Sequence, residues 1–415
     1  MDTSTSNAWY TRLHWQILIA MLVGTLVGLL GGPKTVDWFA WLGVLFIRLL
    51  KMIIVPLVMT SIVTGIASVG TGKSLGRLFG KTLGYYVLSS ALAAVAGLIL
   101  VNALKPGVGS NIAGVEQTGI QEVSTPSSPA ELLIDIVPEN VIAAAAAPDM
   151  LALIFFSIVF GISISTLPAK PRTLLIDLFE AGFQAMMRLT SGVIRFAPIG
   201  VFGLIVRVVG ASGLDSFRPL AKYMATIAIG LTFHLLVSLP LLLIVLGRIK
   251  PSVHFRNMRE AMAMAFSTSS SAATLPVTLD AVENKMGVSN RISSFVLPMG
   301  ATVNMDGTAL YECAGVLFIA QVLGIDLSMW QQFLVVTTAL LASIGAAAVP
   351  SAGLVIIFIV LESVNLRGPE VDLIVGAMLA VDRPLDMFRT AVNVFSDSCG
   401  AAIIARSEGE DQVDT

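Results

Sequence analysis

The amino-acid sequence predicts an all-α, polytopic membrane protein. Three observations support this fold class: 55% of the 415 residues are hydrophobic, only 13% are charged, and the mean hydropathy is +0.86. Soluble domains carry a charged fraction of about 25%. The apolar residues form long unbroken runs rather than the alternating pattern of a membrane β-barrel. A membrane-spanning helix needs about 20 residues, so the apolar content is sufficient for about eight spans.

Charge, cysteine and histidine content exclude several classes of site. The formal net charge of −2 provides no basic field for nucleic acid. The two cysteines, Cys313 and Cys399, lie in apolar stretches, where a structural disulfide is not expected. The three histidines, His14, His234 and His254, lack the spacing of metal ligands, and we expect them to be interfacial or packing residues.

Apolar segments mark the expected membrane spans in the first part of the chain. These segments are 14–31, 38–69, 82–104, 132–168, 187–210 and 221–247. The second contains Arg48, Lys51 and Pro56, and the fourth is broken near Pro138. The polar stretch 105–131, which carries Gly, Ser and Thr, is typical of an aqueous loop.

The distribution of Lys and Arg predicts a cytoplasmic N-terminus. With this orientation the cytoplasmic connections contain more basic residues than the external ones, as the positive-inside rule requires. The cytoplasmic set is Arg12, Lys73, Arg77, Lys81, Lys170, Arg172, Arg248, Lys250, Arg256 and Arg259, and the external set is Lys34, Lys105, Arg218 and Lys222.

Two later apolar segments contain helix breakers and small residues. Residues 267–276 read STSSSAATLP, and residues 343–353 read SIGAAAVPSAG. They share the pattern Ser-x-x-Ala-Ala-x-aliphatic-Pro, with Pro276 and Pro350 separated by 74 positions. Paired broken helices are typical of transporter binding sites built from inverted repeats, because freed backbone groups at membrane depth must be buried in protein or line a cavity. The alternative is two kinked packing helices with small residues at their contact.

An apolar helix with polar groups follows each broken segment. The first, within 292–324, contains Asn304-Met305-Asp306-Gly307-Thr308, where we expect Gly307 to unwind the backbone and expose carbonyl groups to a cation. The second, within 370–405, carries polar residues on one helical face: Asp382, Asp386, Arg389, Thr390, Asn393 and Asp397.

Carboxylates outnumber cations on these two helices. The carboxylates are Asp306, Asp382, Asp386 and Asp397, and the cations are Arg383 and Arg389. Buried carboxylates in excess require bound cations, and oxygen ligands suit sodium rather than a transition metal. Arg389 can pair with a ligand carboxylate, and Asp386 can accept an ammonium group. This face fits a ligand with both charges; the alternative is a salt-bridge network that only holds helices together.

Three further observations concern ions, protons and catalysis. Tyr86, Ser89 and Ser90 share one face of the span 82–104 and can supply hydroxyl groups to an ion or form interhelical hydrogen bonds. Glu312 lies in an apolar helix, where it is either a proton carrier or a paired or pore-facing glutamate. The sequence has no His-Glu-x-x-His, no Gly-x-Ser-x-Gly and no histidine near a candidate nucleophile, so we do not expect an enzyme.

In these motifs the sequence resembles the glutamate transporter family, the dicarboxylate/amino acid:cation symporters. Archaeal aspartate transporters and mammalian excitatory amino acid transporters are members of this family. The resemblance covers nearly the whole chain. It rests on Phe46–Met52, Tyr85-Tyr86, Ile136-Val137-Pro138, Ala197–Gly200, the serine-rich segment, Asn304–Thr308 and the stripe from Asp386 to Asp397.

The resemblance implies eight membrane helices and two re-entrant helical hairpins, at 252–285 and 329–364, in a homotrimer that works as an elevator. It also implies a division of the chain into parts. These are a scaffold (1–77 and 132–215), an extracellular loop (106–131), a moving transport domain (78–105 and 216–407) and an acidic tail (408–415).

The resemblance further implies how a substrate binds. Arg389, helped by Thr308, would bind the side-chain carboxylate, and Asp386 would hold the amino group. The main-chain carboxylate would contact Asn393 and the hairpin serines, and backbone at Val349 would close the second hairpin. The implied substrate set is Ser270, Ser271, Thr308, Val349, Asp386, Arg389, Thr390 and Asn393.

Three sodium sites are implied in the same way. The first would use Asp397 with carbonyl groups of Gly300, Asn304 and Asn393; the second Asp306, Asn304, Tyr86, Ser89 and Ser90; the third backbone at Thr302, Ser343, Ile344 and Ala346. Glu312 matches the proton-carrying glutamate of mammalian members, where archaeal members have Gln, and this favours proton co-transport.

The chain departs from the family pattern at several positions. Archaeal members have Arg where this chain has Ser269, and mammalian members have Arg at the position of Met387. Arg383, one turn before Met387, is the candidate for the same gating role. In the second hairpin, Ala346 and Ala348 stand where archaeal members have Thr and Gly.

We therefore expect a sodium-driven symporter of aspartate or glutamate in a cell membrane, and a prokaryotic inner membrane is favoured. The expected partners are the acidic amino acid, sodium ions, the bilayer and two further copies of the chain, with no nucleic acid. The alternatives are a dicarboxylate or neutral amino acid transporter of the same fold, coupled to protons or sodium, and a passive anion channel.

Overall fold

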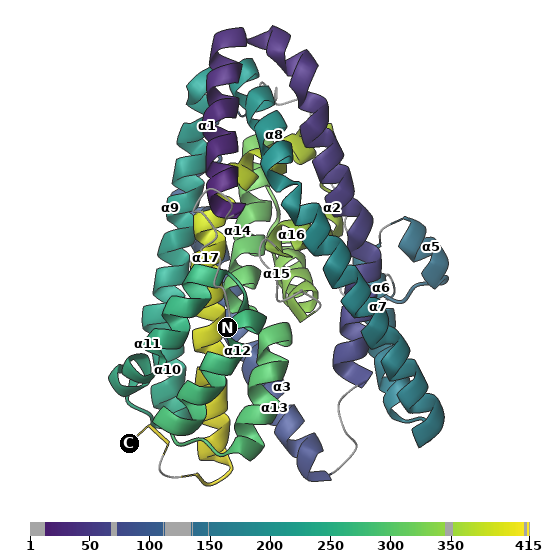
Figure 1. The fold of residues 1–415 in the computed structure, drawn as a ribbon, viewed down its shortest axis with the longest axis vertical. Helices are drawn as coiled ribbons and strands as arrows, with labels where there is room; N and C mark the ends of the chain where they lie inside the picture. Colours follow the sequence, from purple (N-terminus) through teal and green to yellow (C-terminus); the bar gives the residue numbers. More distant parts are fainter. Residues whose placement is uncertain are drawn as a thin grey trace, which may run out of the picture.

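Figure 1 shows the computed structural model of the chain, in which long helices run along the longest axis of the molecule. The structure describes residues 13–67, 73–110, 112, 134, 136–147, 149–344, 352–410, 413 and 414. Every regular element within these ranges is helical. The predicted all-α class is confirmed, whereas the eight-span arrangement stays a prediction.

The first half of the chain forms α1 (Leu13–Gly31), α2 (Pro33–Ala67), α3 (Lys73–Leu104), α5 (Val141–Ala146), α6 (Met150–Ser165), α7 (Ala169–Arg195) and α8 (Ala197–Ser212). The segment 187–210, expected as one span, is bent, because its residues belong to the end of α7 and to α8, which meet at 48°. Pro198 lies in the first turn of α8, where its missing N–H group is not needed, so the chain begins a new helix there.

The second half begins with the 3₁₀ turn η2 (Gly213–Ser216), α9 (Phe217–Phe233), the π-helical η3 (His234–Ser238), α10 (Leu239–Leu242) and the π-helical η4 (Leu243–Gly247). It continues with α11 (Pro251–Thr268), α12 (Ser271–Asp280), the π-helical η5 (Ala281–Lys285), α13 (Asn290–Val303), α14 (Asp306–Leu323), α15 (Met329–Ile344), α16 (Ala352–Ser363) and α17 (Pro369–Ser407).

The two broken segments form two helix pairs. Ser269, with φ 52°, separates α11 from α12, and Ser270 caps α12 by accepting a hydrogen bond from the backbone N–H of Ala273 at 3.2 Å. The helices α15 and α16 pack against each other. Their connection, which includes Ala346, Ala348 and Val349, lies outside the described residues.

The expected unwinding around Gly307 lies slightly earlier in the chain. The break between α13 and α14 is at Asn304 and Met305, and Gly307 is helical. Gly307 serves close packing instead, because a Cβ atom there would lie 3.0 Å from Cα of Arg389 in α17. A helical glycine therefore marks a close approach between two helices and not the break itself.

The helices pack in two groups. One group contains α1, α2, α6, α7 and α8, and the other contains α3 and α9 to α17. Contacts of α8 with α17 and of α2 with α16 join the groups. Gly203 allows α8 to approach α2 closely, since a Cβ atom there would lie 2.8 Å from the backbone nitrogen of Gly43.

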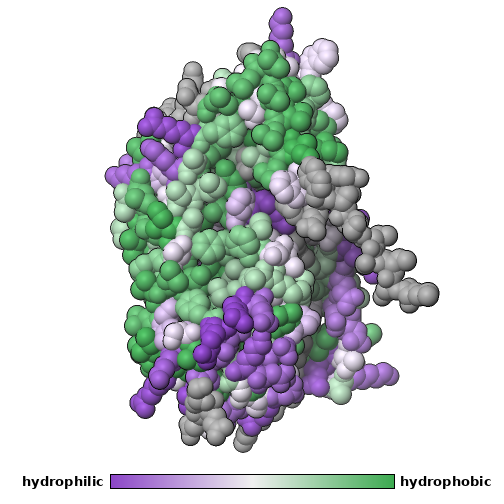
Figure 2. All heavy atoms as spheres, turned by 60° about the vertical axis from the view of Figure 1, so that its left-hand side comes forward, coloured by the Kyte–Doolittle hydropathy of each residue, from purple (hydrophilic) through white to green (hydrophobic). Residues whose placement is uncertain are grey.

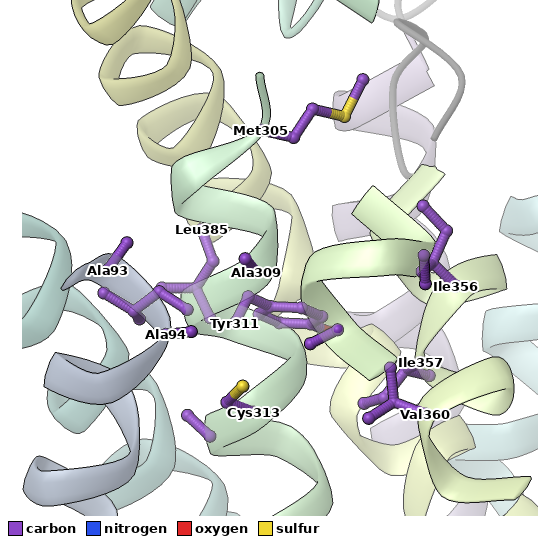
Figure 3. Packing of buried hydrophobic residues seen from close by; sticks show 14 of the residues in the cluster. Ala93, Ala94, Met305, Ala309, Tyr311, Cys313, Ile356, Ile357, Val360 and Leu385 are labelled. Carbon is purple, nitrogen blue, oxygen red and sulfur yellow. The ribbon is translucent and has the colours of Figure 1, made fainter. Parts of the chain in front are cut away.

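Helix α14 lies at the centre of the second group. Nearly all of its side chains are buried, and it packs against α3, α15, α16 and α17. Figure 3 shows Tyr311 and Cys313 of α14 with the small Ala93 of α3 on one side and Ile357 of α16 on the other. A helix that is buried on nearly every face is typical of the interior of a large or membrane-embedded protein.

The outer surface is suited to a membrane. Figure 2 shows hydrophobic side chains over most of the height of one face, with hydrophilic side chains gathered near its lower end. Four helical segments in the described ranges are long and apolar enough to cross a membrane, or five if the bent pair α7–α8 counts as one span. The four are Lys34–Ala67, Gly76–Leu104, Phe217–Gly247 and Asn290–Leu323.

Glu408 ties the end of α17 to two neighbouring helices. Its carboxylate lies 2.5 Å from Nζ of Lys81, 2.7 Å from Nη2 of Arg77 and 3.4 Å from Nη2 of Arg291. Hydrogen bonds from Lys81 and Arg77 lower the pKa of Glu408 to about 2. Glu408 is the first residue of the expected acidic tail, and these basic side chains neutralise its negative charge.

We expect Glu408→Gln to lower thermal stability in a pH-dependent way. Because the folded-state pKa lies below the ordinary glutamate value of 4.5, the carboxylate stabilises the fold fully above pH 4.5, and this contribution is lost as the pH falls towards 2. Melting curves of both proteins should differ most at neutral pH and converge in acid. The exposed Glu370→Gln serves as a control. A pH-independent difference would contradict the prediction.

Candidate functional site

The break between α13 and α14 positions the first group of polar side chains. The backbone of Asn304 is extended there, with φ −95° and ψ 95°, and its N–H still donates to the carbonyl of Gly300 at 2.9 Å. Its side-chain Nδ2 donates to Oδ1 of Asp397 at 2.9 Å and to Oγ of Ser396 at 3.0 Å. The break thus faces the polar stripe of α17.

Asp306 is the most extensively hydrogen-bonded carboxylate of the group. It begins α14 and is fully buried. Its Oδ1 lies 2.6 Å from Oγ of Ser90 and 3.1 Å from Oγ of Ser89, and its Oδ2 lies 2.6 Å from Oγ of Ser396 and 3.0 Å from Nε2 of His234. These donors and the helix N-terminus stabilise the negative charge.

Gly300 makes room for two oxygen atoms. A Cβ atom at this position would lie 2.6 Å from Oδ1 of Asp397 and 2.6 Å from the hydroxyl of Tyr86. Tyr86 donates to the carbonyl of Val296 at 2.7 Å. The glycine therefore lets the backbone of α13 approach a carboxylate and a phenol, which concentrates oxygen atoms at one point.

The structure brings most of the expected sodium residues of the first two sites together. Asn304 links Asp397 to Ser396, and Ser396 in turn contacts Asp306. The described residues contain no group of three or more His, Cys, Asp and Glu side chains arranged to hold a metal ion. A cation here would therefore depend on amide, hydroxyl and backbone oxygen atoms as well as carboxylates, which is the donor set of a hard ion.

The residues expected for a third sodium site are only partly described. The hydroxyl of Thr302 lies 3.0 Å from the carbonyl of Met299, and that of Ser343 donates to its own helix. Ser343 also lines a cavity of about 160 Å³ whose other lining residues include Tyr86 and Ser90. Ile344 ends α15, and Ala346 lies outside the described residues.

Arg389 is a buried cation with one nitrogen atom uncommitted. Its Nη2 lies 2.9 Å from Oδ1 of Asp386 and 3.3 Å from Oδ1 of Asp382. The guanidinium stands 3.9 Å from the ring centroid of Tyr311. Within the described part of the chain, Nη1 has no hydrogen-bond acceptor. A Cβ atom on Gly353, in α16, would lie 2.9 Å from this Nη1, so the second helix pair approaches it.

Asp386 bridges two guanidinium groups. Its other oxygen, Oδ2, lies 3.0 Å from Nη1 of Arg383. Together with Asp382 and Arg389 these residues form a salt-bridge network within α17, whereas the alternative considered from the sequence was a network that holds helices together. An ammonium group would have to compete with Arg383 for Asp386.

The remaining expected substrate residues lie on three elements. Asn393 accepts a hydrogen bond from the N–H of Gly307 at 2.7 Å, and Thr390 donates to the carbonyl of Asp386 at 2.8 Å. Thr308 is buried in the first turn of α14. Ser270 and Ser271 lie at the start of α12, which packs on α17. Val349 is outside the described residues.

Glu312 is buried two turns into α14. Its side chain has no exposed surface, and neither carboxyl oxygen has a hydrogen-bond partner among the described residues. The paired glutamate considered from the sequence is thus not observed. An ionised carboxylate in such surroundings is costly.

His234 and His254 are buried, as packing residues are, and each also has polar partners that the sequence did not indicate. His234 contacts Asp306, and His254 lies 2.5 Å from Oδ2 of Asp414 and 2.9 Å from Oγ of Ser398. Sequence reasoning missed these roles, as it missed Ser396 and Tyr311. The available signal was that a histidine in an apolar run is costly unless it is paired.

The sequence indicated no histidine near a candidate nucleophile. The folded chain nevertheless brings one histidine close to two such residues. Ser398 and Cys399 both lie beside His254, with Cys399 Sγ 3.6 Å from Nε2. All of these side chains are fully buried, as is nearly all of Asp414. Their burial and mutual hydrogen bonds indicate a structural role.

Comparisons with known proteins agree with this geometry. The chain from residue 13 to 407 matches the sodium:dicarboxylate symporter family. It is 36% identical to a proton/sodium-glutamate symport protein of Bacillus caldotenax, over 96% of this chain and 95% of the relative. A proton/glutamate-aspartate symporter of Escherichia coli is 36% identical, covering 95% of this chain and 93% of the relative. The excitatory amino acid transporter 3 of Mus musculus is 35% identical, covering 97% and 88%.

The resemblance inferred from the motifs is thereby confirmed over almost the full length. A buried arginine beside a carboxylate and hydroxyl cluster, together with these relatives, leads to one conclusion. The chain belongs to the sodium:dicarboxylate symporter family.

Proposed function

We propose that this multi-pass protein of the cell membrane is a secondary active symporter that moves an acidic amino acid, aspartate or glutamate, into the cell with sodium. The observation that carries the proposal is the buried Arg389, whose Nη1 has no hydrogen-bond acceptor among the described residues. The same helix carries Asp397, which lies with Asn304, Asp306 and the serine hydroxyl groups in what we call the oxygen cluster. The names of the relatives support an acidic amino acid as the substrate.

The substrate would bind on α17. Arg389 would take its side-chain carboxylate with help from Thr308, since a guanidinium and a carboxylate form charge-assisted hydrogen bonds. Asp386 would receive the ammonium after Arg383 turns away, and Asn393 with Ser270 and Ser271 would hold the main-chain carboxylate. The other members of the proposed set are Thr390 and backbone at Val349.

Sodium would bind at three places around the substrate. Asp397 with Gly300, Asn304 and Asn393 would form one site. Asp306, Asn304, Tyr86, Ser89 and Ser90 would form another, and backbone at Thr302, Ser343, Ile344 and Ala346 a third. The close packing of Gly300 against Asp397 and Tyr86 supports this proposal.

The packing of the helices in two groups supports a division of the chain into the expected scaffold and transport domain. In the proposed arrangement, eight helices cross the membrane with the N-terminus in the cytoplasm, and α11–α12 and α15–α16 are re-entrant hairpins. Three copies would assemble through the scaffold, and the second group would move as an elevator. The short break at Ser269 between antiparallel arms supports the first hairpin.

We expect concentrative uptake of radiolabelled aspartate or glutamate into proteoliposomes only with an inward sodium gradient. Adding succinate as a competitor tests whether Arg383, by occupying Asp386, favours a dicarboxylate without an ammonium group. Strong competition by succinate would favour that second candidate. Equilibration without accumulation would indicate a channel instead.

Arg389→Cys should weaken uptake of acidic amino acids by at least about 100-fold, because charge-assisted hydrogen bonds to the substrate are lost. Uptake of neutral amino acids should rise relative to the parent. The exposed Arg188→Cys on α7 is a matched control. Unchanged aspartate affinity in the Arg389 variant would exclude the assigned role.

Glu312→Gln should remove the pH dependence of uptake if Glu312 carries the proton. The amide keeps the size of the side chain but cannot exchange a proton. Uptake and the accompanying proton movement are measured across a range of external pH, with Glu370→Gln as the exposed control. A pH profile like that of the parent would place the proton route elsewhere.

A further inference from the structure

The residues that follow α17 return to the base of α11. Val413 is fully buried, and Asp414 is only 5% exposed. One carboxylate oxygen of Asp414 lies 2.5 Å from Nδ1 of His254, and the other accepts a hydrogen bond from Nδ2 of Asn257 at 2.8 Å. The backbone N–H of Asp414 donates to the carbonyl of Met286 at 2.9 Å, beyond the end of η5.

His254 connects this segment to α17. Its Nε2 lies 2.9 Å from Oγ of Ser398, and its ring packs edge-on against Phe395 at 5.2 Å between centroids. Cys399 Sγ lies 3.6 Å from the same nitrogen. The imidazole is fully buried, so each of its ring nitrogen atoms has a polar neighbour in place of water.

Glu410 provides a second attachment. Its carboxylate accepts a hydrogen bond from the backbone N–H of Ser289 at 2.9 Å and contacts the hydroxyl of the same residue. Arg406 holds the returning chain by donating to the carbonyl of Val413 at 3.1 Å. The segment therefore contacts both the first turns of α11 and the chain that leaves η5.

We propose that Glu410, Val413 and Asp414 form a clasp that holds the α11–α12 pair on α17. Asp414 and His254 are then positioning residues for the site on α17. The clasp itself follows from the contacts above, whereas its effect on transport rests on the proposed function. Among the described residues, the hydrogen bonds of the clasp reach His254, Asn257, Met286, Ser289 and Arg406, none of which is a proposed substrate or cation residue.

The burial of His254 explains why the loss of Asp414 would loosen the contact between α11 and α17. Without Asp414, a polar ring would remain buried without a partner at Nδ1, which is costly, and α11 would lower this cost by separating from α17. Because Ser270 and Ser271 lie just beyond the far end of α11, at the start of α12, such a separation displaces them from the stripe. Ser398 directly follows Asp397, so the same change reaches the oxygen cluster.

Cys399 provides a natural reporter of the clasp. We would react the full-length protein with N-ethylmaleimide and measure labelling of each cysteine by mass spectrometry. Cys399 is buried against His254, and Cys313 is buried in α14, away from the clasp. In Asp414→Ala, labelling of Cys399 should be at least about tenfold faster, as expected when a charged hydrogen bond that opposes local opening is lost.

Cys313 in the same molecules is the internal control. Its labelling should not change in Asp414→Ala, and the exposed Asp177→Ala on α7, which removes the same charge, should leave both cysteines protected. Unchanged labelling of Cys399, or equal acceleration at both cysteines, would overturn the proposal. Should Asp414→Ala fail to fold, Asn257→Ala removes one contact of the clasp and should give a smaller, still selective increase.

Transport measurements test the positioning role separately. Asp414→Ala should raise the sodium and substrate concentrations for half-maximal uptake by several-fold with a smaller change in maximal rate. Asp414→Asn retains a hydrogen-bond acceptor and should partly restore both values. Unchanged half-maximal concentrations would overturn the positioning role. If the parent protein shows no uptake, the proposed function fails, while the labelling result still decides the clasp.

Discussion

Neutralisation of buried charge on α17 is the constraint on which the rest of the site depends. Asp382, Asp386 and Arg389 are each at most 5% exposed. An uncompensated charge in such a place costs several kcal/mol, so each must find a partner within the protein. The chain supplies these partners along the helix itself, at spacings of three and seven residues, and Arg383 completes the set.

The need to compensate buried charge on α17 also affects how α14 packs against it. Tyr311 can lie under the Arg389 guanidinium only if the two helices approach closely, and Gly307 provides the space. The N–H of Gly307 then reaches Asn393 of α17. One close contact between helices thus supports both the arginine and the break in the chain at Asn304 and Met305.

Periodicity and helix breakers made much of this predictable from the sequence. The stripe on α17 follows from its spacing, and the break at Ser269 follows from a serine-rich segment within an apolar run. The partners of His254 could not be predicted, because Asp414 lies 160 positions away and no local pattern joins them. The position of the break near Gly307 was misjudged for another reason: a glycine can indicate either backbone freedom or close packing, and only the neighbouring helix decides.

The hydroxyl groups around Asp306 can change their hydrogen-bonding role without any movement of the backbone. A serine hydroxyl is both donor and acceptor, so rotation about one bond converts it from a hydrogen-bond donor to an oxygen ligand. Ser89, Ser90 and Ser396 can change role in this way without moving any helix. The ring nitrogen of His234 that faces Asp306 has no such freedom while it carries a proton. The carboxylate therefore has a fixed side and an adaptable side, and an ion bound there, as proposed, would gain hydroxyl ligands through side-chain rotation alone.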